Sequence, residues 1–248
     1  MVDRPFLTDC LWSAGGRNGE GGTEDAYAMG ELAKAWTRGL QSPRPSKLNS
    51  SRELLQVVVT LKHFAVNTLE NTDPWTRTSF DANASFGVGN FALADYYLRP
   101  FQAAIQDADA RGIMCSYNAV LNLPTCLSPL LRNARKQWGF QGYVTSDTDS
   151  IASATSDHHY TSSPEQATAL GLTDGQCDVN SGATYSGNIL GALKDRTENL
   201  TIADVDRALF NSFKQRFDLG LFDPKEAYDW PGKEDIGTDV TSQALEKV

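Results

Sequence analysis

Reactive side chains stand at the ends of three apolar runs that are far apart in the sequence. Lys62 and His63 follow the run VVVTL, and Tyr117 closely follows the run GIMC. Asp147 directly follows the run YVTS. A polar residue at the end of a single apolar run indicates only a turn. A cation, an imidazole, a phenol and a carboxylate at successive run ends favour a single reactive site.

The residue types allow more than one chemistry. Asp147 could attack an anomeric carbon as a nucleophile, provided that an acid elsewhere releases the leaving group. Lys62 and His63 would then donate hydrogen bonds to substrate hydroxyls, or the imidazole would carry a proton. A different chemistry is a Schiff base formed by Lys62. A purely structural interpretation places Lys62 in a salt bridge with Asp147 or Asp149 and makes the imidazole a satisfied, half-buried group.

The three apolar runs are continuous, as expected for strands that are buried on both faces of a parallel sheet. Helical signals lie between and after them. They are a helix at 90–109 interrupted by Pro100, a helix from Ser128 to Gly139, a start at Ser163 with a capping-box Gln166, and an apolar stripe at Ile202, Val205, Leu209, Phe213 and Phe217. The alternation predicts an α/β fold whose parallel strands bring their C-terminal ends, and the reactive residues, to one rim.

Length and charge limit the class of ligand. With 248 residues, 40% of them hydrophobic, the chain is close in length to a complete (β/α)8 barrel. The formal charge of −9 and the pI near 4.8 argue against a nucleic acid or an anionic membrane as partner. They suit a neutral or cationic ligand. No apolar run reaches the roughly 18 residues that a membrane-spanning helix needs.

Cysteine spacing and the N-terminus bear on cofactors and on the compartment. Cys10, Cys115, Cys126 and Cys177 follow no CxxC spacing, and we predict no metal and no cofactor. The first residues, MVDRPFLTDC, contain no apolar signal-peptide core. Three N-x-S/T triplets are present, but such triplets arise often by chance and support secretion only weakly.

Several stretches in order resemble glycoside hydrolase family 3, in particular its β-xylosidase-type branch. They are GRNGEGGTED, VVVTLKHFAVNTLEN, GIMCSYNAVLNLPTC, GYVTSDTDSI, HHYTSS, CDVNSGATY and LGLFDP, which lie between residues 12 and 224. The resemblance implies an incomplete (β/α)8 TIM-barrel-like domain at 1–224, formed by the later strands of the barrel. It also implies that 225–248 is a tail or the start of a linker to a C-terminal α/β sandwich domain.

The resemblance assigns roles to individual residues. Asp147 matches the catalytic nucleophile of the family. The residues that match sugar-binding or neighbouring rim positions are Arg17, Glu20, Lys62, His63 and Tyr117. Asp149 is expected to cap or bond to the following loop.

The implied activity is retaining, exo-acting hydrolysis of xylo-oligosaccharides by a secreted glycoprotein, as in xylan breakdown. A β-glucosidase-type member and a sugar-binding remnant without activity are the alternatives. Glu70, in the sequence LEN, favours the xylosidase branch. Where that branch has two cysteines, Thr148 and Ser181 carry hydroxyls, which implies that one disulfide is absent. Cys115 and Cys126 keep the family spacing, and the resemblance implies that they pair.

Two parts of a family member are expected to lie outside this chain. One is a set of earlier barrel strands, and the other is the sandwich domain, which brings the general acid/base glutamate. We therefore expect a chain that holds the nucleophile without the acid. Because an incomplete barrel leaves an open sheet edge and an uncovered apolar face, we also expect the isolated chain to associate or aggregate.

Overall fold

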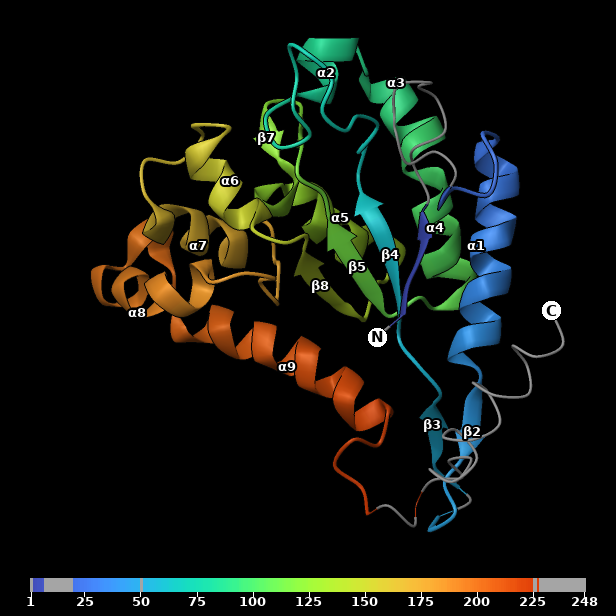
Figure 1. The fold of residues 1–248 in the computed structure, drawn as a ribbon. Coiled ribbons are helices and arrows are strands. Elements are labelled where there is room, and N and C mark those ends of the chain that lie inside the picture. The colour runs from blue at the N-terminus through green and yellow to red at the C-terminus, as the bar shows by residue number, and fades with distance from the viewer. Residues whose placement is uncertain (1, 7–19, 50, 225–226, 228–248) are drawn as a thin grey trace, which may run out of the picture.

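The computed structural model describes residues 2–6, 20–49, 51–224 and 227, with the backbone alone for 2–6. Its centre is a four-stranded parallel sheet in the order β1-β4-β5-β8 (Figure 1). The strands are β1 (Val2–Phe6), β4 (Val59–Phe64), β5 (Gly112–Cys115) and β8 (Tyr143–Ser146). The predicted α/β fold with parallel strands is confirmed. Within the described residues the sheet is open and does not close into a barrel.

Helices flank both sides of this sheet (Figure 1). On the β1 side, α1 (Ala26–Gln41) packs along α4 (Arg99–Ala108). On the β8 side lie α6 (Ser150–Ser156), α7 (Pro164–Thr173), α8 (Thr184–Asp195) and α9 (Ile202–Asp218). The other elements are β2 (Pro43–Pro45), β3 (Glu53–Leu55), α2 (Ala82–Phe86), α3 (Asn90–Ala92), the π-helical turn Leu93–Tyr97, β6 (Ala119–Val120), β7 (Leu123–Pro124), α5 (Pro129–Trp138), and 3-10 turns at Thr125–Leu127 and Thr197–Asn199. No helix among the described residues has the length and apolar character needed to cross a membrane.

Polar caps set the helix boundaries much as predicted. The side chain of Ser128 accepts a hydrogen bond from the first turn of α5, and Gly139 ends this helix with φ of 74°. The Ser163 hydroxyl accepts from the backbone N–H of Gln166 at the start of α7. The capping-box prediction for Gln166 is wrong in one detail, because its side chain accepts from the N–H and the hydroxyl of Ser162 instead.

Two predicted boundaries shift. β4 continues to Phe64, so Lys62 and His63 lie inside the strand and do not follow it. The chain stays extended there because Phe64 and Ala65 beyond them are buried in the core. The helix predicted at 90–109 is divided at Leu98, two residues ahead of Pro100, because proline supplies no N–H and is favoured in the first turn of a helix.

The core is built on the register of the parallel strands. Leu61, Ile113 and Val144 are partners in successive strands, and all three are fully buried. Beside this row, the rings of Phe64 and Phe101 meet edge to face with centroids 5.0 Å apart, which joins β4 to α4. Strands buried on both faces explain why the apolar runs in the sequence are continuous.

Cys115, at the end of β5, forms a disulfide with Cys126, as the resemblance implied. The bond closes the loop that contains the β6–β7 hairpin. Cys177 is a buried free thiol whose sulfur lies 3.9 Å from that of Cys115. Because Cys115 is the last residue of β5, the disulfide lies at the C-terminal end of the strands.

We predict that removing this disulfide lowers the free energy of unfolding by about 3 kcal/mol, because a short loop is then open in the unfolded chain. The variant is Cys115→Ala with Cys126→Ala, since substituting Cys126 alone would leave the Cys115 thiol beside Cys177. Urea denaturation measures the change. Dithiothreitol should produce a similar loss in the unmodified chain and none in the double variant. An unmodified chain whose urea midpoint does not respond to dithiothreitol contradicts the prediction.

Candidate active site

Asp147 stands directly after β8, at the rim formed by the C-terminal ends of the strands. Its backbone N–H donates to the Cys115 carbonyl at 3.1 Å and so continues the β5–β8 ladder past the strand end. The side chain is mostly buried, with 17% of its surface exposed. Oδ1 accepts from the Thr148 N–H at 2.7 Å, and Oδ2 lies 3.2 Å from Nε2 of His63. A backbone donor and an imidazole thus hold the two carboxylate oxygens.

His63 lies in β4 and is fully buried, in contrast to the half-buried histidine of the structural interpretation. Both ring nitrogens have partners. Nδ1 lies 3.4 Å from the amide nitrogen of the buried Asn67. Nε2 faces a carboxylate, which can only accept, so the proton on Nε2 is donated to Asp147. The imidazole is therefore satisfied and also acts as a donor to the reactive carboxylate.

Tyr117 lies in the segment that joins β5 to the β6–β7 hairpin, and 8% of its surface is exposed. Nε2 of His158 lies 2.7 Å from the carbonyl oxygen of Tyr117, which holds this segment in place. Burial and then the charge of Asp147 raise the pKa of Tyr117 to about 12. The phenol therefore stays protonated at neutral pH and serves as a donor to the neighbouring carboxylate.

The environment of Asp147 favours its ionised form. Burial raises the pKa of this carboxyl, but the groups around it outweigh burial. His63 contributes most, followed by the Thr148 N–H and the hydroxyl of Tyr117. Together they hold the pKa of Asp147 below its ordinary value of 3.8, so the group carries the negative charge that nucleophilic attack requires.

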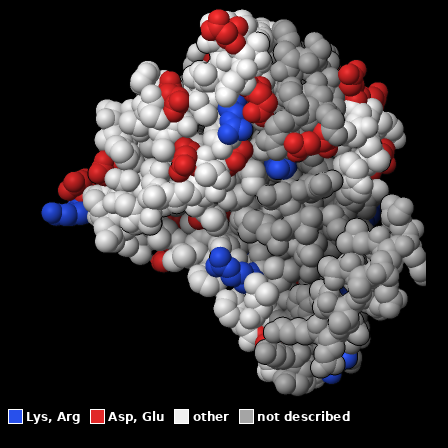
Figure 2. Space-filling model, in the orientation of Figure 1, with Lys and Arg blue, Asp and Glu red and all other residues white. Residues whose placement is uncertain are grey.

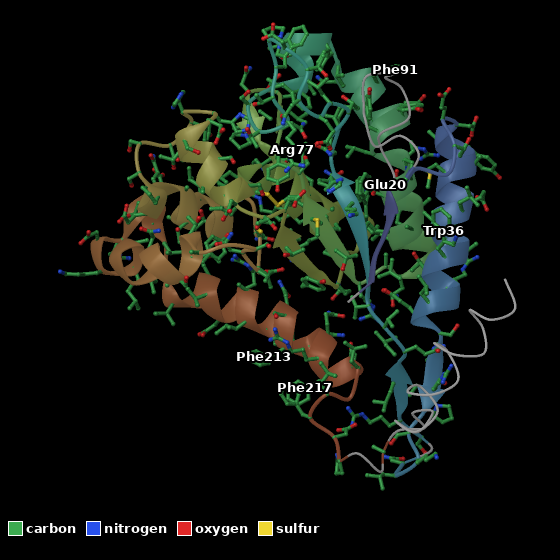
Figure 3. The ribbon with its side chains drawn as sticks, viewed as in Figure 1. Glu20, Trp36, Arg77, Phe91, Phe213 and Phe217 are labelled. Atoms are coloured by element: carbon green, nitrogen blue, oxygen red, sulfur yellow. A yellow bond between two sulfur atoms is a disulfide. The ribbon has the colours of Figure 1, made fainter. Side chains whose placement is uncertain are left out.

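Arg77 belongs to the same site, although the sequence reasoning missed it. Its guanidinium carbon lies 4.7 Å from the centroid of the Tyr117 ring, within cation–π distance. Its Nη1 is also 3.2 Å from Oε2 of Glu70. Figure 3 shows Arg77 above the C-terminal ends of β4 and β5, on the side where Glu20 lies. The sequence does place a cation, Arg77, in the long loop after β4, and this was the available signal. The fold of that loop, however, decides where the Arg77 side chain points.

Two of the other predicted residues, Lys62 and Glu20, lie among the described residues. Lys62 precedes His63 in β4 and is half-buried. Glu20 is exposed and lies next to the part of the chain that the structure leaves undescribed. Arg17 lies outside the described residues.

The loop after Asp147 is tied to a second loop by hydrogen bonds. The hydroxyl oxygens of Thr148 and Ser181 are 2.9 Å apart, at the two positions where the resemblance implied a missing disulfide. The backbone N–H of Asp149 donates to the Ser181 carbonyl at 2.8 Å. Asp149 was expected to cap or bond to the following loop. It bonds through its backbone, and its side chain makes no capping hydrogen bond to α6.

Acidic side chains outnumber basic ones over the upper half of the face in Figure 2, at the level of the strand ends in Figure 1. Such a rim disfavours anionic ligands and accepts neutral ones. No group of three or more His, Cys, Asp and Glu side chains in the described ranges is arranged to hold a metal ion. An ionised, mostly buried carboxylate with fixed donors is suited to attack on an electrophilic carbon.

We predict that Tyr117→Phe raises the pKa of Asp147, because the carboxylate loses one of the donors that favour its charged form. The stability that Asp147 contributes is present above its unfolded pKa of about 3.9 and is lost as the pH falls through the lower folded value. In the variant that loss should be smaller and should be complete at a higher pH, because the folded and unfolded pKa values lie closer together. NMR titration of the Asp147 carboxyl carbon measures the shift. Tyr27→Phe, at an exposed tyrosine of α1, is the control and should leave the titration unchanged. An unchanged titration in Tyr117→Phe would show that the phenol does not act on the carboxylate.

Comparison with known proteins identifies the family. Residues 9–209 match the model described as the glycosyl hydrolase family 3 N terminal domain. The chain is 38% identical over 209 residues to "Probable beta-D-xylosidase 7" of Arabidopsis thaliana, which covers 84% of this chain and 26% of that protein. It is 30% identical over 233 residues to "Beta-xylosidase/alpha-L-arabinofuranosidase 2" of Medicago sativa subsp. varia, covering 92% and 29% of the two chains.

Solved structures agree on the fold. A family 3 exo-β-xylosidase in complex with a xylobiose aziridine probe has a TM-score of 0.80 and 26% identity, over 93% of this chain and 29% of that chain. A β-glucosidase from Listeria innocua has a TM-score of 0.79 at 24% identity, which shows the fold alone, over 99% and 32% of the two chains. The chain thus spans less than a third of each of these proteins. It belongs to glycoside hydrolase family 3, and residues 9–209 correspond to the N-terminal domain of that family.

Proposed function

We propose that this chain is the later part of the catalytic (β/α)8 barrel of a retaining, exo-acting β-xylosidase, with Asp147 as the nucleophile. In this proposal residues 1–224 belong to the barrel, and 225–248 lead toward a C-terminal sandwich domain. The observation that carries the proposal is the ionised Asp147 at the strand-end rim, held by His63 and the Thr148 N–H. Relatives named as β-D-xylosidases support the substrate class.

In the proposed reaction, a carboxylate oxygen of Asp147 forms a bond to the anomeric carbon while the bond from that carbon to the leaving-group oxygen breaks. The leaving group takes the electron pair of the broken bond and a proton from a general acid. Water then attacks the anomeric carbon and gives a proton to the base form of the same acid, while the bond to Asp147 breaks, which releases the sugar and restores the carboxylate. Donors from His63 and Thr148 keep the carboxylate oriented without neutralising it.

The acid is expected about 5–5.5 Å from the nucleophile in a retaining enzyme. Of the two nearest candidates in this chain, Glu70 is engaged with Arg77 at 3.2 Å, and Glu20 is exposed. We therefore assign the acid to the sandwich domain expected in the longer protein.

Sugar binding is assigned to the rim residues around Asp147. Lys62, His63 and Tyr117, with Arg17 and Glu20, are the proposed contacts to the sugar hydroxyls. Arg77 joins them because its guanidinium lies against the Tyr117 ring and presents several donors to the same space. The Schiff-base role of Lys62 is not retained, since a carboxylate nucleophile is the pattern for retaining glycosidases.

Xylo-oligosaccharides are the proposed substrates. A solved β-glucosidase from Erythrobacter marinus, 27% identical with a TM-score of 0.72, keeps glucosides as the second candidate. We also propose that the protein is a secreted glycoprotein. The Cys115–Cys126 disulfide supports an oxidising compartment, and Asn49 and Asn199 are exposed in N-x-S/T triplets.

We predict that an activated 2-fluoro-xyloside labels this chain covalently at Asp147, because its good leaving group needs little help from an acid. Intact mass spectrometry and peptide mapping detect the adduct. Asp147→Asn should abolish labelling, since the amide keeps the shape of the side chain and loses its charge. Turnover of xylobiose by the chain alone should be very low.

The matched control is Asp149→Asn, two residues further along the same loop, which should be labelled like the unmodified chain. Persistent labelling of Asp147→Asn, or an adduct on Asp149, overturns the assignment of the nucleophile. Rapid xylobiose hydrolysis by the chain alone would show instead that an acid is present within it.

A further inference from the structure

Asn67 lies where an extended chain would not carry it, next to the ring of His63. Along a strand, two residues four positions apart are separated by about 13 Å. Here the amide nitrogen of Asn67 is 3.4 Å from Nδ1 of His63. Both side chains are buried, with 3% of Asn67 and 1% of His63 exposed. The chain therefore folds back sharply after β4 and places an amide against the ring that faces Asp147.

The turn that brings Asn67 back is made at Val66. The φ angle of Val66 is 63°, in the left-handed region, which is a genuine outlier for a β-branched residue. Val66 is also fully buried, and its carbonyl accepts from the Thr68 N–H at 3.0 Å. Strained backbone of this kind clusters at functional sites. The conformation of Val66 therefore points to a role for the residue that the turn presents.

The neighbouring segment holds the turn in this conformation. The Ala65 carbonyl accepts from the Ser116 hydroxyl at 3.3 Å and from the Asn118 amide at 3.2 Å. Ser116 and Asn118 flank Tyr117, whose phenol is a donor to the reactive carboxylate. Strain persists only where the surroundings determine the conformation fully, and these two hydrogen bonds do so here. The turn after β4 and the Tyr117 segment are thus fixed together.

The orientation of the Asn67 amide decides what Nδ1 of His63 meets. With the NH2 group toward the ring, Nδ1 accepts, and the amide oxygen is buried with no hydrogen-bond partner among the described residues. In the reversed orientation the oxygen would accept from a protonated Nδ1, and the NH2 group would take the place without a partner. Buried N–H groups without a partner are rarer in proteins than buried carbonyl oxygens without one. This difference favours the first orientation.

We propose that Asn67 is a positioning residue for the reactive carboxylate. Its amide donates to Nδ1 of His63, which leaves the ring with a single proton, on Nε2, and directs that proton to Asp147. A neutral ring orients the carboxylate and leaves its negative charge available for attack, whereas an imidazolium would neutralise that charge. The effect on attack rests on the proposed nucleophilic role of Asp147, but the position of the proton on His63 does not.

Long-range proton–nitrogen NMR correlation of the chain, labelled at its histidine nitrogens, tests the proposal without any substitution in the site. The chain has three histidines, and the signals lost in His158→Gln and in His159→Gln leave the third set for His63. At neutral pH, Nε2 of His63 should carry the proton, and Nδ1 should have the resonance of an unprotonated nitrogen that accepts a hydrogen bond. A proton on Nδ1, whether or not Nε2 also carries one, overturns the proposal.

Asn67→Leu tests whether Asn67 is the donor. Leucine is similar in size and cannot donate, so the Nδ1 resonance of His63 should move away from its hydrogen-bonded value. Covalent labelling of Asp147 by the activated 2-fluoro-xyloside should become about tenfold slower. Thr68→Val is the matched control, because it removes a buried hydroxyl from the next residue and leaves the Asn67 amide in place. It should leave both measurements unchanged.

An Nδ1 resonance that is the same in Asn67→Leu as in the unmodified chain overturns the proposal. Labelling of Asn67→Leu at the unmodified rate also overturns it, as does a Thr68→Val chain that changes as much as Asn67→Leu. If Asn67→Leu does not fold, the resonances of the unmodified chain decide the question. An unmodified chain that is never labelled contradicts the proposed nucleophile instead, and the resonances still decide the role of Asn67.

Discussion

Backbone hydrogen bonds between the strand ends position the imidazole, the phenol and the carboxylate of the described rim. The N–H of Ser116 donates to the Phe64 carbonyl at 2.9 Å, and the N–H of Asp147 donates to the Cys115 carbonyl at 3.1 Å. These bonds continue the β4–β5–β8 ladder by one step past the strands. Because parallel strands end on one side, the ladder brings an imidazole, a phenol and a carboxylate from distant parts of the sequence to one rim.

Asp178, a buried carboxylate beside β8, connects α5 and α9 to this strand. The side chain of Asp178 is fully buried and pairs with Arg135 of α5. It also accepts from the Val144 N–H at 2.8 Å and from the Asn211 amide at 3.0 Å. Removing one partner of such a buried pair costs about 3–5 kcal/mol. The Asn211 contact therefore holds α9 against the buried carboxylate beside β8.

Sequence reasoning located three of the four strands of the central sheet and the capped starts of α5 and α7, because those depend on local signals, but it did not predict β1. Ser128 and Ser163 cap helices wherever they occur, and a continuous β-branched run needs burial on both faces. The end of β4 was missed because burial of Phe64, a tertiary property, extends the strand. Arg77 was missed for a related reason. Its approach to Tyr117 is set by the path of a loop, and no spacing in the sequence encodes that path.

The loop after Asp147 shows that backbone hydrogen bonds at the strand end, more than contacts between the loops, hold the carboxylate in place. A disulfide between positions 148 and 181, which are 33 residues apart, would contribute about 3–4 kcal/mol. The hydroxyl pair found there contributes about 0.5–1.5 kcal/mol. Even so, the Asp147 carboxylate still accepts the Thr148 N–H at 2.7 Å, because that donor belongs to the backbone. The Ser181 N–H in turn donates to the Ser146 hydroxyl at 2.9 Å, which ties the second loop to the end of β8. Exchanging cysteines for hydroxyls therefore weakens the tie between the loops, while the strand end continues to hold the carboxylate in place.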